Sequence, residues 1–300
     1  MLPKRCDLCP RYCKVDRPAG ETGFCGAGAM PEVSLVGLHH WEEPSISGSR
    51  GSGTVFFPRC NLRCVFCQNH EISQGGRGQA MTPERLARAF ISLQERGAHN
   101  VNLVSPTHYS RQVASAIRIS RELGLVIPIV YNSNGYESPE ALSCLDGLVD
   151  VYLPDLKYCS DALALRYSSA PDYFAHATRA ILEMSRQVGV PRFDDEGVIV
   201  SGLIVRHLVL PGCSHDSSEV LKWFATNLPR GTYLSLMSQY YPTHKAGMYP
   251  ELNRRLRKTE YDGVLEAMSR LGISDGYVQG LSSASSAYKP DFSRSNESVV

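Results

Sequence analysis

The chain has 300 residues, enough for one large domain or two small ones. Its 31 Lys and Arg residues against 30 Asp and Glu residues leave a net charge of +1, which argues against nucleic-acid binding as the main activity. No apolar run approaches the roughly 18 residues of a membrane-spanning helix, and the first residues lack the apolar stretch of a secretory signal. We therefore expect a cytoplasmic protein with neither a membrane nor a nucleic-acid partner.

Composition changes twice along the chain, which predicts three parts. Residues 1–50 are rich in Cys, Gly and Pro with little periodicity, so we expect a small cysteine-rich extension shaped by bound metal. Residues 51–280 alternate apolar β-type runs with amphipathic stretches, which is typical of an α/β domain. Residues 281–300 are dominated by serine, and we expect a flexible tail there.

The central part divides into units of about thirty residues, each a strand followed by a helix. Strands are expected at 54–58, 101–104, 125–130, 149–153, 199–210 and 233–237, and helices at 83–96, 111–123, 139–145, 172–188 and 217–227. Thr82 and Ser138 each precede a proline and are expected to cap the helices that follow. Six such strands favour a partial α/β barrel over a flat doubly wound sheet, because no GxGxxG follows the first strand.

Three cysteines follow the first expected strand at the spacing C-x3-C-x2-C: Cys60, Cys64 and Cys67. A structural zinc site requires four protein ligands, and this loop offers three. A [4Fe–4S] cluster held by three thiolates leaves one iron open to a small molecule. An open metal position is typical of a reactive centre, so this loop is the candidate catalytic site.

A second group of cysteines lies in the extension: Cys6, Cys9, Cys13 and Cys25. Four thiolates within twenty residues make a complete set for zinc or for a second iron–sulfur cluster, and spacing does not decide between these metals. The closed set favours a structural metal. The other three cysteines, Cys144, Cys159 and Cys213, are interpreted as core or incidental residues.

The C-x3-C-x2-C loop, with aromatic Phe66 before its last cysteine, resembles the cluster loop of the radical S-adenosylmethionine (radical SAM) enzymes. That resemblance implies a partial (β/α)6 barrel, a [4Fe–4S] cluster and bound S-adenosylmethionine. It also implies reductive cleavage of S-adenosylmethionine to a 5′-deoxyadenosyl radical that abstracts a hydrogen atom. An electron donor such as flavodoxin or ferredoxin would supply the electron.

Three later stretches resemble the pyruvate formate-lyase-activating enzymes, a radical SAM subfamily. Asn132–Gly135, Asp155–Lys157 and Arg206–Gly212 are similar to the TNG, DLK and R-x4-PG stretches of those enzymes. The resemblance implies a protein substrate that receives a glycyl radical. The chain departs from the family where it reads VSPTHY at 104–109 in place of a GGE-like motif, so other products stay open. These are radical modification of another protein residue or of a small molecule, or a zinc-binding interaction protein without catalysis.

Polar residues at the carboxyl ends of barrel strands face the site of a barrel. With the resemblance, this gives a set of expected cofactor-binding residues: Phe66, Ser105, Thr107, Asn134, Asp155, Lys157, Arg206 and His244.

Individual roles follow from side-chain chemistry. Asn134 offers the cofactor a hydrogen bond, Lys157 or Arg206 a cation for its carboxylate, and Asp155 an acceptor for a cation or a ribose hydroxyl. The hydroxyls of Ser105 or Thr107 stand where the GGE-like motif has its carboxylate.

Two further segments contain histidine. His108 is interpreted either as a group near the substrate or as an ordinary loop residue. The run His39–Glu43 is interpreted as a surface or interdomain segment, because it lacks the HExxH spacing of a metal site.

Overall fold

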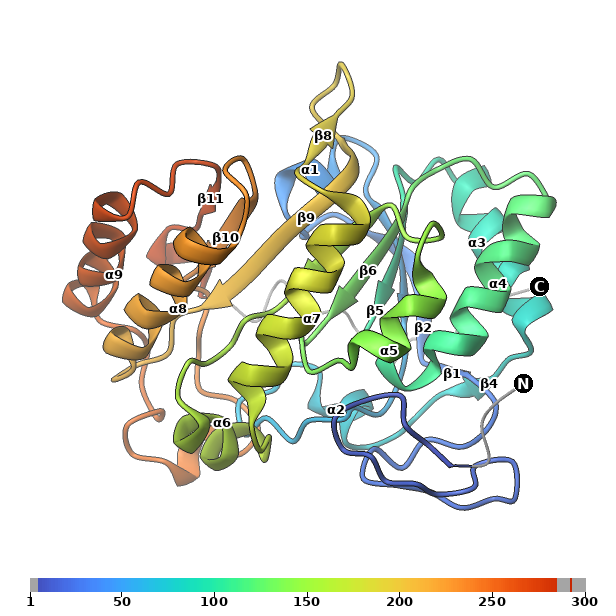
Figure 1. Cartoon of the computed structure of the whole chain (residues 1–300), viewed down its shortest axis with the longest axis horizontal. Coiled ribbons are helices and arrows are strands. Elements are labelled where there is room, and N and C mark those ends of the chain that lie inside the picture. Colours follow the sequence, from blue (N-terminus) through green and yellow to red (C-terminus); the bar gives the residue numbers. More distant parts are fainter. Residues whose placement is uncertain (1–4, 285–291, 293–300) are drawn as a thin grey trace.

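A computed structural model describes residues 5–284 and Phe292 of the chain. Its centre is a curved, mostly parallel sheet (Figure 1). The parallel strands are β3 (Ser52–Phe56), β5 (Val101–Val104), β6 (Ile129–Ser133), β7 (Val151–Pro154), β9 (Ile199–Leu208), β10 (Tyr233–Met237) and β11 (Gly276–Val278). They follow the spatial order β11-β10-β9-β7-β6-β5-β3.

Two strands join the sheet in the antiparallel direction. Strand β2 (Leu35–His39) pairs with β3 at one edge, and β8 (Arg192–Phe193) pairs with β9. Within the described residues β2 and β11 are the outer strands of this order and do not pair with each other. The sheet is therefore an open, partial barrel, which confirms the expected fold class. Strands β1 (Glu32–Val33) and β4 (Gln79–Ala80) form a separate antiparallel pair.

The helices that connect the parallel strands cover the outer face of the sheet (Figure 1). The helices are α1 (Pro44–Ser47), α2 (His70–Ser73), α3 (Pro83–Glu95), α4 (Ser110–Glu122), α5 (Pro139–Leu142), α6 (Asp161–Ser168), α7 (Tyr173–Val188), α8 (Ser214–Asn227) and α9 (Lys258–Arg270). Short 3-10 turns lie at Thr107–Tyr109, Ser143–Leu145, Ala246–Met248 and Leu281–Ser283. No helix among the described residues is both long and apolar enough to cross a membrane.

The core forms where helices pack against the sheet. Leu86, Phe90 and Leu93 of α3 are fully buried in the same apolar cluster as Val101 and Leu103 of β5. The parallel strands are buried along nearly their whole length because their outer face lies under helices. Their sequences are therefore continuous apolar runs rather than alternating ones.

Most expected elements agree with the structure. The strands expected at 101–104 and 233–237 match β5 and β10 to the residue. The hydroxyls of Thr82 and Ser138 accept hydrogen bonds from the backbone N–H groups of Arg85 and Ala141, which confirms both helix caps.

The elements that were not expected include strands β2 and β11 and helices α6 and α9, together with the short elements β1, β4, β8, α1 and α2. Strand β2 lies inside the expected extension at 1–50, so the sheet begins before the expected boundary. Of the expected tail, Leu281–Ser283 form a turn and the Phe292 ring packs against Phe56 with ring centroids 5.4 Å apart. Residues 285–291 and 293–300 lie outside the described residues.

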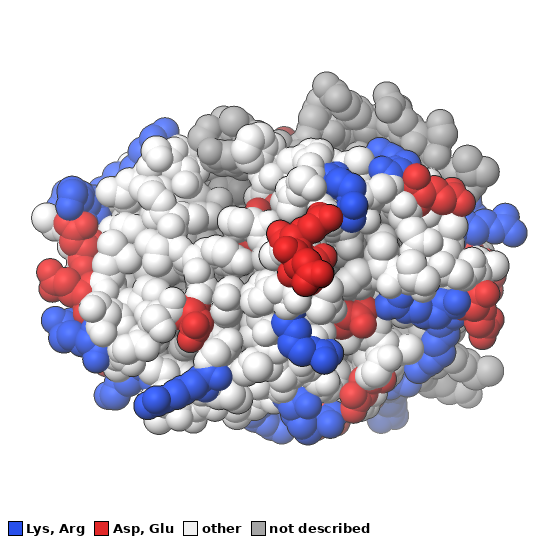
Figure 2. Space-filling model, turned by 90° about the horizontal axis from the view of Figure 1, so that it is seen from above, with Lys and Arg blue, Asp and Glu red and all other residues white. Residues whose placement is uncertain are grey.

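Charges on the face seen in Figure 2 are mixed in sign. Lys and Arg side chains alternate with Asp and Glu around the rim, and apolar or uncharged side chains lie between them. This face therefore offers no extended surface of one sign, in keeping with the near-zero net charge.

The cap of α3 leads to a prediction about stability. Replacing Thr82 with alanine removes the hydroxyl that accepts from the Arg85 N–H, and should lower the free energy of unfolding by about 1 kcal/mol. Thr82→Ser keeps the hydroxyl and serves as the matched control. Urea unfolding followed by circular dichroism measures the difference, and equal midpoints for the two variants would contradict the cap.

Candidate active site

A cavity of about 260 Å³ lies at the carboxyl ends of the parallel strands. Its walls include side chains from the loop after β3, from the ends of β5, β6, β7, β9 and β10, and from the segment after β2. Of the residues expected at the site, it is lined by Cys60, Cys64, Phe66, Cys67, Ser105, Asn134, Asp155, Lys157 and Arg206. The curved sheet thus gathers around one space residues that lie up to 146 positions apart in the chain (60 to 206).

Backbone hydrogen bonds hold the cysteine loop in place. The N–H groups of Arg63 and Val65 donate to the carbonyls of Ser168 and Tyr167, at 2.9 and 2.8 Å. The Lys245 N–H donates to the Val65 carbonyl at 2.8 Å. The loop therefore depends on the end of α6 and on the segment after β10, both far from it in sequence.

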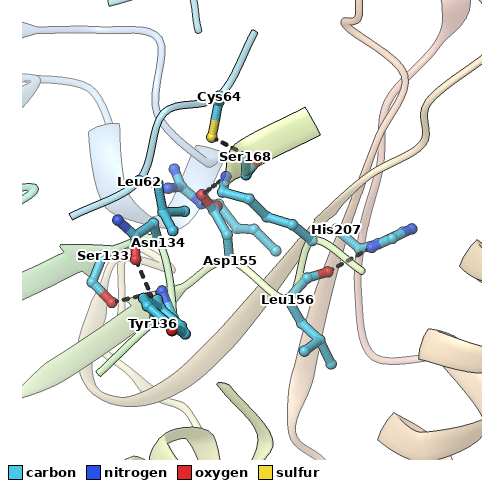
Figure 3. Close-up of polar contacts among 12 residues, drawn as sticks. Leu62, Cys64, Ser133, Asn134, Tyr136, Asp155, Leu156, Ser168 and His207 are labelled. Carbon is cyan, nitrogen blue, oxygen red and sulfur yellow. Dashed lines mark hydrogen bonds and ion pairs between the residues drawn. The ribbon is translucent and has the colours of Figure 1, made fainter. Parts of the chain in front are cut away.

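Each of the three loop cysteines has a polar partner of its own. The Asn134 amide donates to the Cys60 sulfur at 3.3 Å. The Ser168 hydroxyl donates to the Cys64 sulfur at 3.0 Å, as Figure 3 shows. The Cys67 sulfur lies 3.2 Å from the Ser73 hydroxyl.

Such donors stabilise sulfur that carries negative charge, which is the form that binds metal. Burial raises the pKa of Cys60 to about 11 and that of Cys64 to about 12. Metal binding at these thiols would therefore release protons.

A buried ionic group lies beside the cysteines. The Asp155 carboxylate accepts from the Lys157 ammonium at 2.5 Å and from the Arg206 guanidinium at 2.9 Å. Burial pushes the pKa of Asp155 upward, but Arg206 and Lys157 outweigh it, and the pKa lies below its usual value. Asp155 is therefore ionised, and both cations are already bound to the protein where they face the cavity. Their expected contact with a cofactor carboxylate stays a prediction.

The segment after β2 corrects one interpretation from the sequence. His39, Trp41 and Glu42 line the cavity, and Glu43 is buried, so the run His39–Glu43 is not simply a surface segment. The Glu42 carboxylate lies 3.5 Å from both Arg206 and the Asn132 amide. Burial raises the pKa of Glu42. The sequence showed which residue types this segment contains, but no pattern in it indicated that the segment lies inside the barrel.

Two of the expected cofactor-binding residues do not line the cavity. Thr107 is buried, and its hydroxyl donates to the Glu137 carboxylate at 2.6 Å. His244 stacks on His70, with ring centroids 4.5 Å apart, beside the cysteine loop. Of the two hydroxyls suggested in place of the GGE-like carboxylate, Ser105 is therefore the one that faces the cavity.

His108 is a buried structural residue in this fold. Its Nε2 donates to the Pro58 carbonyl at 2.8 Å, and its own carbonyl accepts from Arg17 at 2.6 Å. Burial lowers the pKa of His108 to about 3, so the ring is neutral. It lies outside the large cavity and lines a small one with the four N-terminal cysteines. Of the two interpretations of His108, its surroundings therefore match an ordinary loop residue rather than a group near the substrate.

The family model of the Radical SAM superfamily matches residues 54–222, more than half of the chain. The chain belongs to the radical SAM superfamily. Enzymes of this family use a [4Fe–4S] cluster and S-adenosylmethionine for radical chemistry. The residues at the cavity fit both groups, because three thiols with polar donors lie next to side chains of both charges.

The chain is also similar to two proteins of one archaeon and to a solved structure. The uncharacterized protein MJ0674 of Methanocaldococcus jannaschii is 32% identical over 279 residues, which cover 90% of this chain and 76% of that protein. The uncharacterized protein MJ0808 of the same organism is 29% identical over 52% of this chain and 50% of its own length. The crystal structure of Streptococcus suis SuiB bound to S-adenosylmethionine has a TM-score of 0.50 at 12% identity, covering 74% of this chain and 48% of that one. This last likeness shows the fold alone.

The hydroxyl bonded to Cys64 leads to a prediction about the cluster. Ser168→Ala removes a donor that stabilises negative charge on the sulfur, and should lower the reduction potential by roughly 40 mV, the equivalent of about 1 kcal/mol. The iron content should stay unchanged, because serine is not a ligand. Ser218→Ala, on α8, is the matched control. Potentiometric titration followed by electron paramagnetic resonance tests it, and identical potentials in the two variants would refute it.

His207 leads to a prediction about pH. This buried residue bonds the Leu156 carbonyl through Nδ1 at 2.7 Å (Figure 3) and the Ser217 hydroxyl through Nε2 at 2.9 Å. Burial lowers the pKa of His207 to about 4, whereas an unfolded histidine titrates near 6.5. Between these values only the unfolded chain gains the proton, so stability falls as the pH drops.

His207→Gln should lower stability at pH 7 but reduce the loss between pH 7 and pH 5 by about 2 kcal/mol. Urea unfolding at both pH values measures this. His215→Gln, at an exposed position of α8, is the control and should keep the wild-type loss. If His207→Gln loses as much stability between pH 7 and pH 5 as the wild type, a group other than His207 causes the loss at low pH.

Proposed function

We propose that this radical SAM enzyme binds its cluster through Cys60, Cys64 and Cys67 and generates a glycyl radical on a partner enzyme. The observation that carries the proposal is the shared cavity, in which all three cysteines lie with Asn134 and Lys157 at the ends of neighbouring strands. When bound, the cluster and S-adenosylmethionine supply a 5′-deoxyadenosyl radical that abstracts a hydrogen atom.

The side chains of the cavity divide this work. The three thiolates hold iron, and their hydroxyl and amide partners keep them oriented. Lys157 places a positive charge beside the cysteines, where it attracts a carboxylate. Phe66 packs edge-on against Tyr240, and both aromatic residues line the cavity.

The glycyl product rests on three motifs, at residues 132–135, 155–157 and 206–212. All three end parallel strands, and the side chains of Asn134, Asp155 and Arg206 line the cavity. A domain of the pyruvate formate-lyase-activating enzyme from Bacteroides vulgatus is among the similar structures, at a TM-score of 0.41 and 11% identity, which is too distant to carry the argument. We propose a flavodoxin or ferredoxin as electron donor, because the cluster must be reduced before it cleaves S-adenosylmethionine.

The cysteine loop provides the decisive variant. Anaerobically reconstituted wild type, given S-adenosylmethionine and dithionite, should form 5′-deoxyadenosine. Cys64→Ala should lose this activity and most of its roughly four irons per chain. Cys144→Ala is the control, because its thiol lies on the 3-10 turn after α5 and does not line the cavity. Full activity in Cys64→Ala would refute the assignment of the cluster.

The glycyl product requires a separate measurement. A glycine-containing peptide deuterated at the glycine α-carbon should transfer deuterium into 5′-deoxyadenosine. The glycyl product would be refuted if the 5′-deoxyadenosine formed with this peptide carries no deuterium, and a different deuterated substrate does pass deuterium to it. The radical chemistry itself would then still stand.

A further inference from the structure

The four cysteines of the N-terminal segment lie around one small cavity. Its lining includes Cys6, Cys9, Cys13 and Cys25 together with the side chains of Arg11 and Arg17. It is separate from the active-site cavity and shares none of its lining residues. The radical SAM family match begins at residue 54, so it does not account for these cysteines.

The backbone around Cys13 is shaped to hold its sulfur. Tyr12 and Lys14, on either side of it, adopt left-handed φ angles of 43° and 56°, which non-glycine residues rarely do. A Cβ atom added to Gly23 would lie 2.7 Å from both the Cβ and the sulfur of Cys13, so only glycine fits there. Such strain persists where the surroundings impose it.

Hydrogen bonds and charges at the cavity suit thiolates. The Phe24 N–H donates to the Cys13 sulfur at 3.3 Å, and the Ala27 N–H donates to the Cys25 sulfur at 3.5 Å. Four thiolates around a divalent ion carry a net charge of about −2. Arg11 and Arg17 line the same cavity, so two cationic residues lie near the four thiols and offset this charge.

The size of the cavity indicates the kind of metal. Its volume of about 10 Å³ is close to that of one water-sized sphere, whereas the active-site cavity measures about 260 Å³. A single ion fits the smaller space as it stands, which favours one ion over a four-iron cluster. No three Cys, His, Asp or Glu side chains of the described residues yet surround one point at coordination distance. The same holds for the three cysteines of the catalytic loop. We therefore expect the thiols of both sites to move closer together when metal binds.

We propose that Cys6, Cys9, Cys13 and Cys25 bind one Zn²⁺ ion, and that this ion fixes the N-terminal segment against the catalytic cysteine loop. Tetrahedral coordination by four thiolates is the usual form of a structural zinc site. The proposal concerns a site outside the active-site cavity, so it does not depend on the proposed function.

The contacts of the segment explain what the ion would hold. Arg11, between Cys9 and Cys13, donates to the carbonyls of Asn61 and Ser169 at 2.9 and 2.5 Å. In return, Arg63 of the catalytic loop donates to the Phe24 carbonyl at 2.5 Å. The Arg11 guanidinium also stacks on the Phe24 ring, 3.7 Å from its centroid.

These contacts reach the catalytic cysteines through one residue. Asn61 follows Cys60 directly, donates from its amide to the Tyr136 carbonyl at 2.7 Å, and accepts from Asn134 at 2.7 Å. Asn134 is the residue that donates to the Cys60 sulfur. Loss of the ion should therefore loosen the catalytic loop as well as the N-terminal segment.

Elemental analysis of the anaerobically purified and reconstituted enzyme tests the metal. Wild type should contain about one zinc per chain beside about four irons. Cys13→Ala should lose the zinc and keep the iron, whereas Cys159→Ala, at a cysteine outside both sites, should keep both. About eight irons without zinc, or four irons without zinc, would overturn the proposal.

Two further measurements keep the test sharp. Gly23→Ala keeps all four thiols but displaces Cys13, so it should reduce the zinc content. This variant serves as the test if Cys13→Ala does not fold. Hydrogen–deuterium exchange should rise at residues 59–67 when zinc is lost, and stay at the wild-type level in Cys159→Ala. Unchanged exchange at 59–67 in zinc-free protein would overturn the positioning role.

Discussion

The active site depends on the buried ionic contacts of Asp155 with Lys157 and Arg206. Strands β7 and β9 end side by side, and an isolated bridge joins Asp155 to Arg206 there. The Arg206 guanidinium also donates to the Asn132 side chain at 2.6 Å and lies 3.5 Å from Glu42. Since a buried charge is costly without its partner, each of these groups holds the others in place. The order β9-β7-β6 of the sheet is what brings them together.

The barrel could be predicted from the sequence because local signals mark the start and end of most of its strands and helices. Apolar β-type runs, proline after a capping residue and a spacing of about thirty residues were all visible in the chain. The short missing elements carried weaker signals, whereas α9, with 13 residues and Glu260 in its first turn, had signals that our expectations left out. Strand β2 is half-buried and follows a cysteine-rich stretch, and α6 has only eight residues. Strand β11 has three residues, too few for a pattern to emerge.

The site was predictable where a motif marks the end of a strand, and not where tertiary structure brings a residue in. Asn134 and Asp155 follow strands directly and Cys60 lies on the loop after β3, so barrel geometry placed them in the cavity. Ser168 reaches Cys64 from a helix that the sequence did not indicate, 104 residues away. Glu42 reaches the barrel interior because its segment leaves the antiparallel edge strand β2, a position that no local pattern reports.

Although the chain lacks the GGE-like motif, a carboxylate still reaches the cavity, and it comes from a different segment of the chain. No carboxylate follows β5, and Thr107 there turns away to Glu137, but Glu42 enters the cavity from the segment after β2. The cavity thus carries two carboxylates, of Asp155 and Glu42, and two cations, of Lys157 and Arg206. S-adenosylmethionine carries a carboxylate, an ammonium and a sulfonium, so walls of both signs suit it better than a surface of one sign. A near-neutral cavity lined by paired charges of both signs is therefore compatible with this cofactor even though the usual acidic motif is absent.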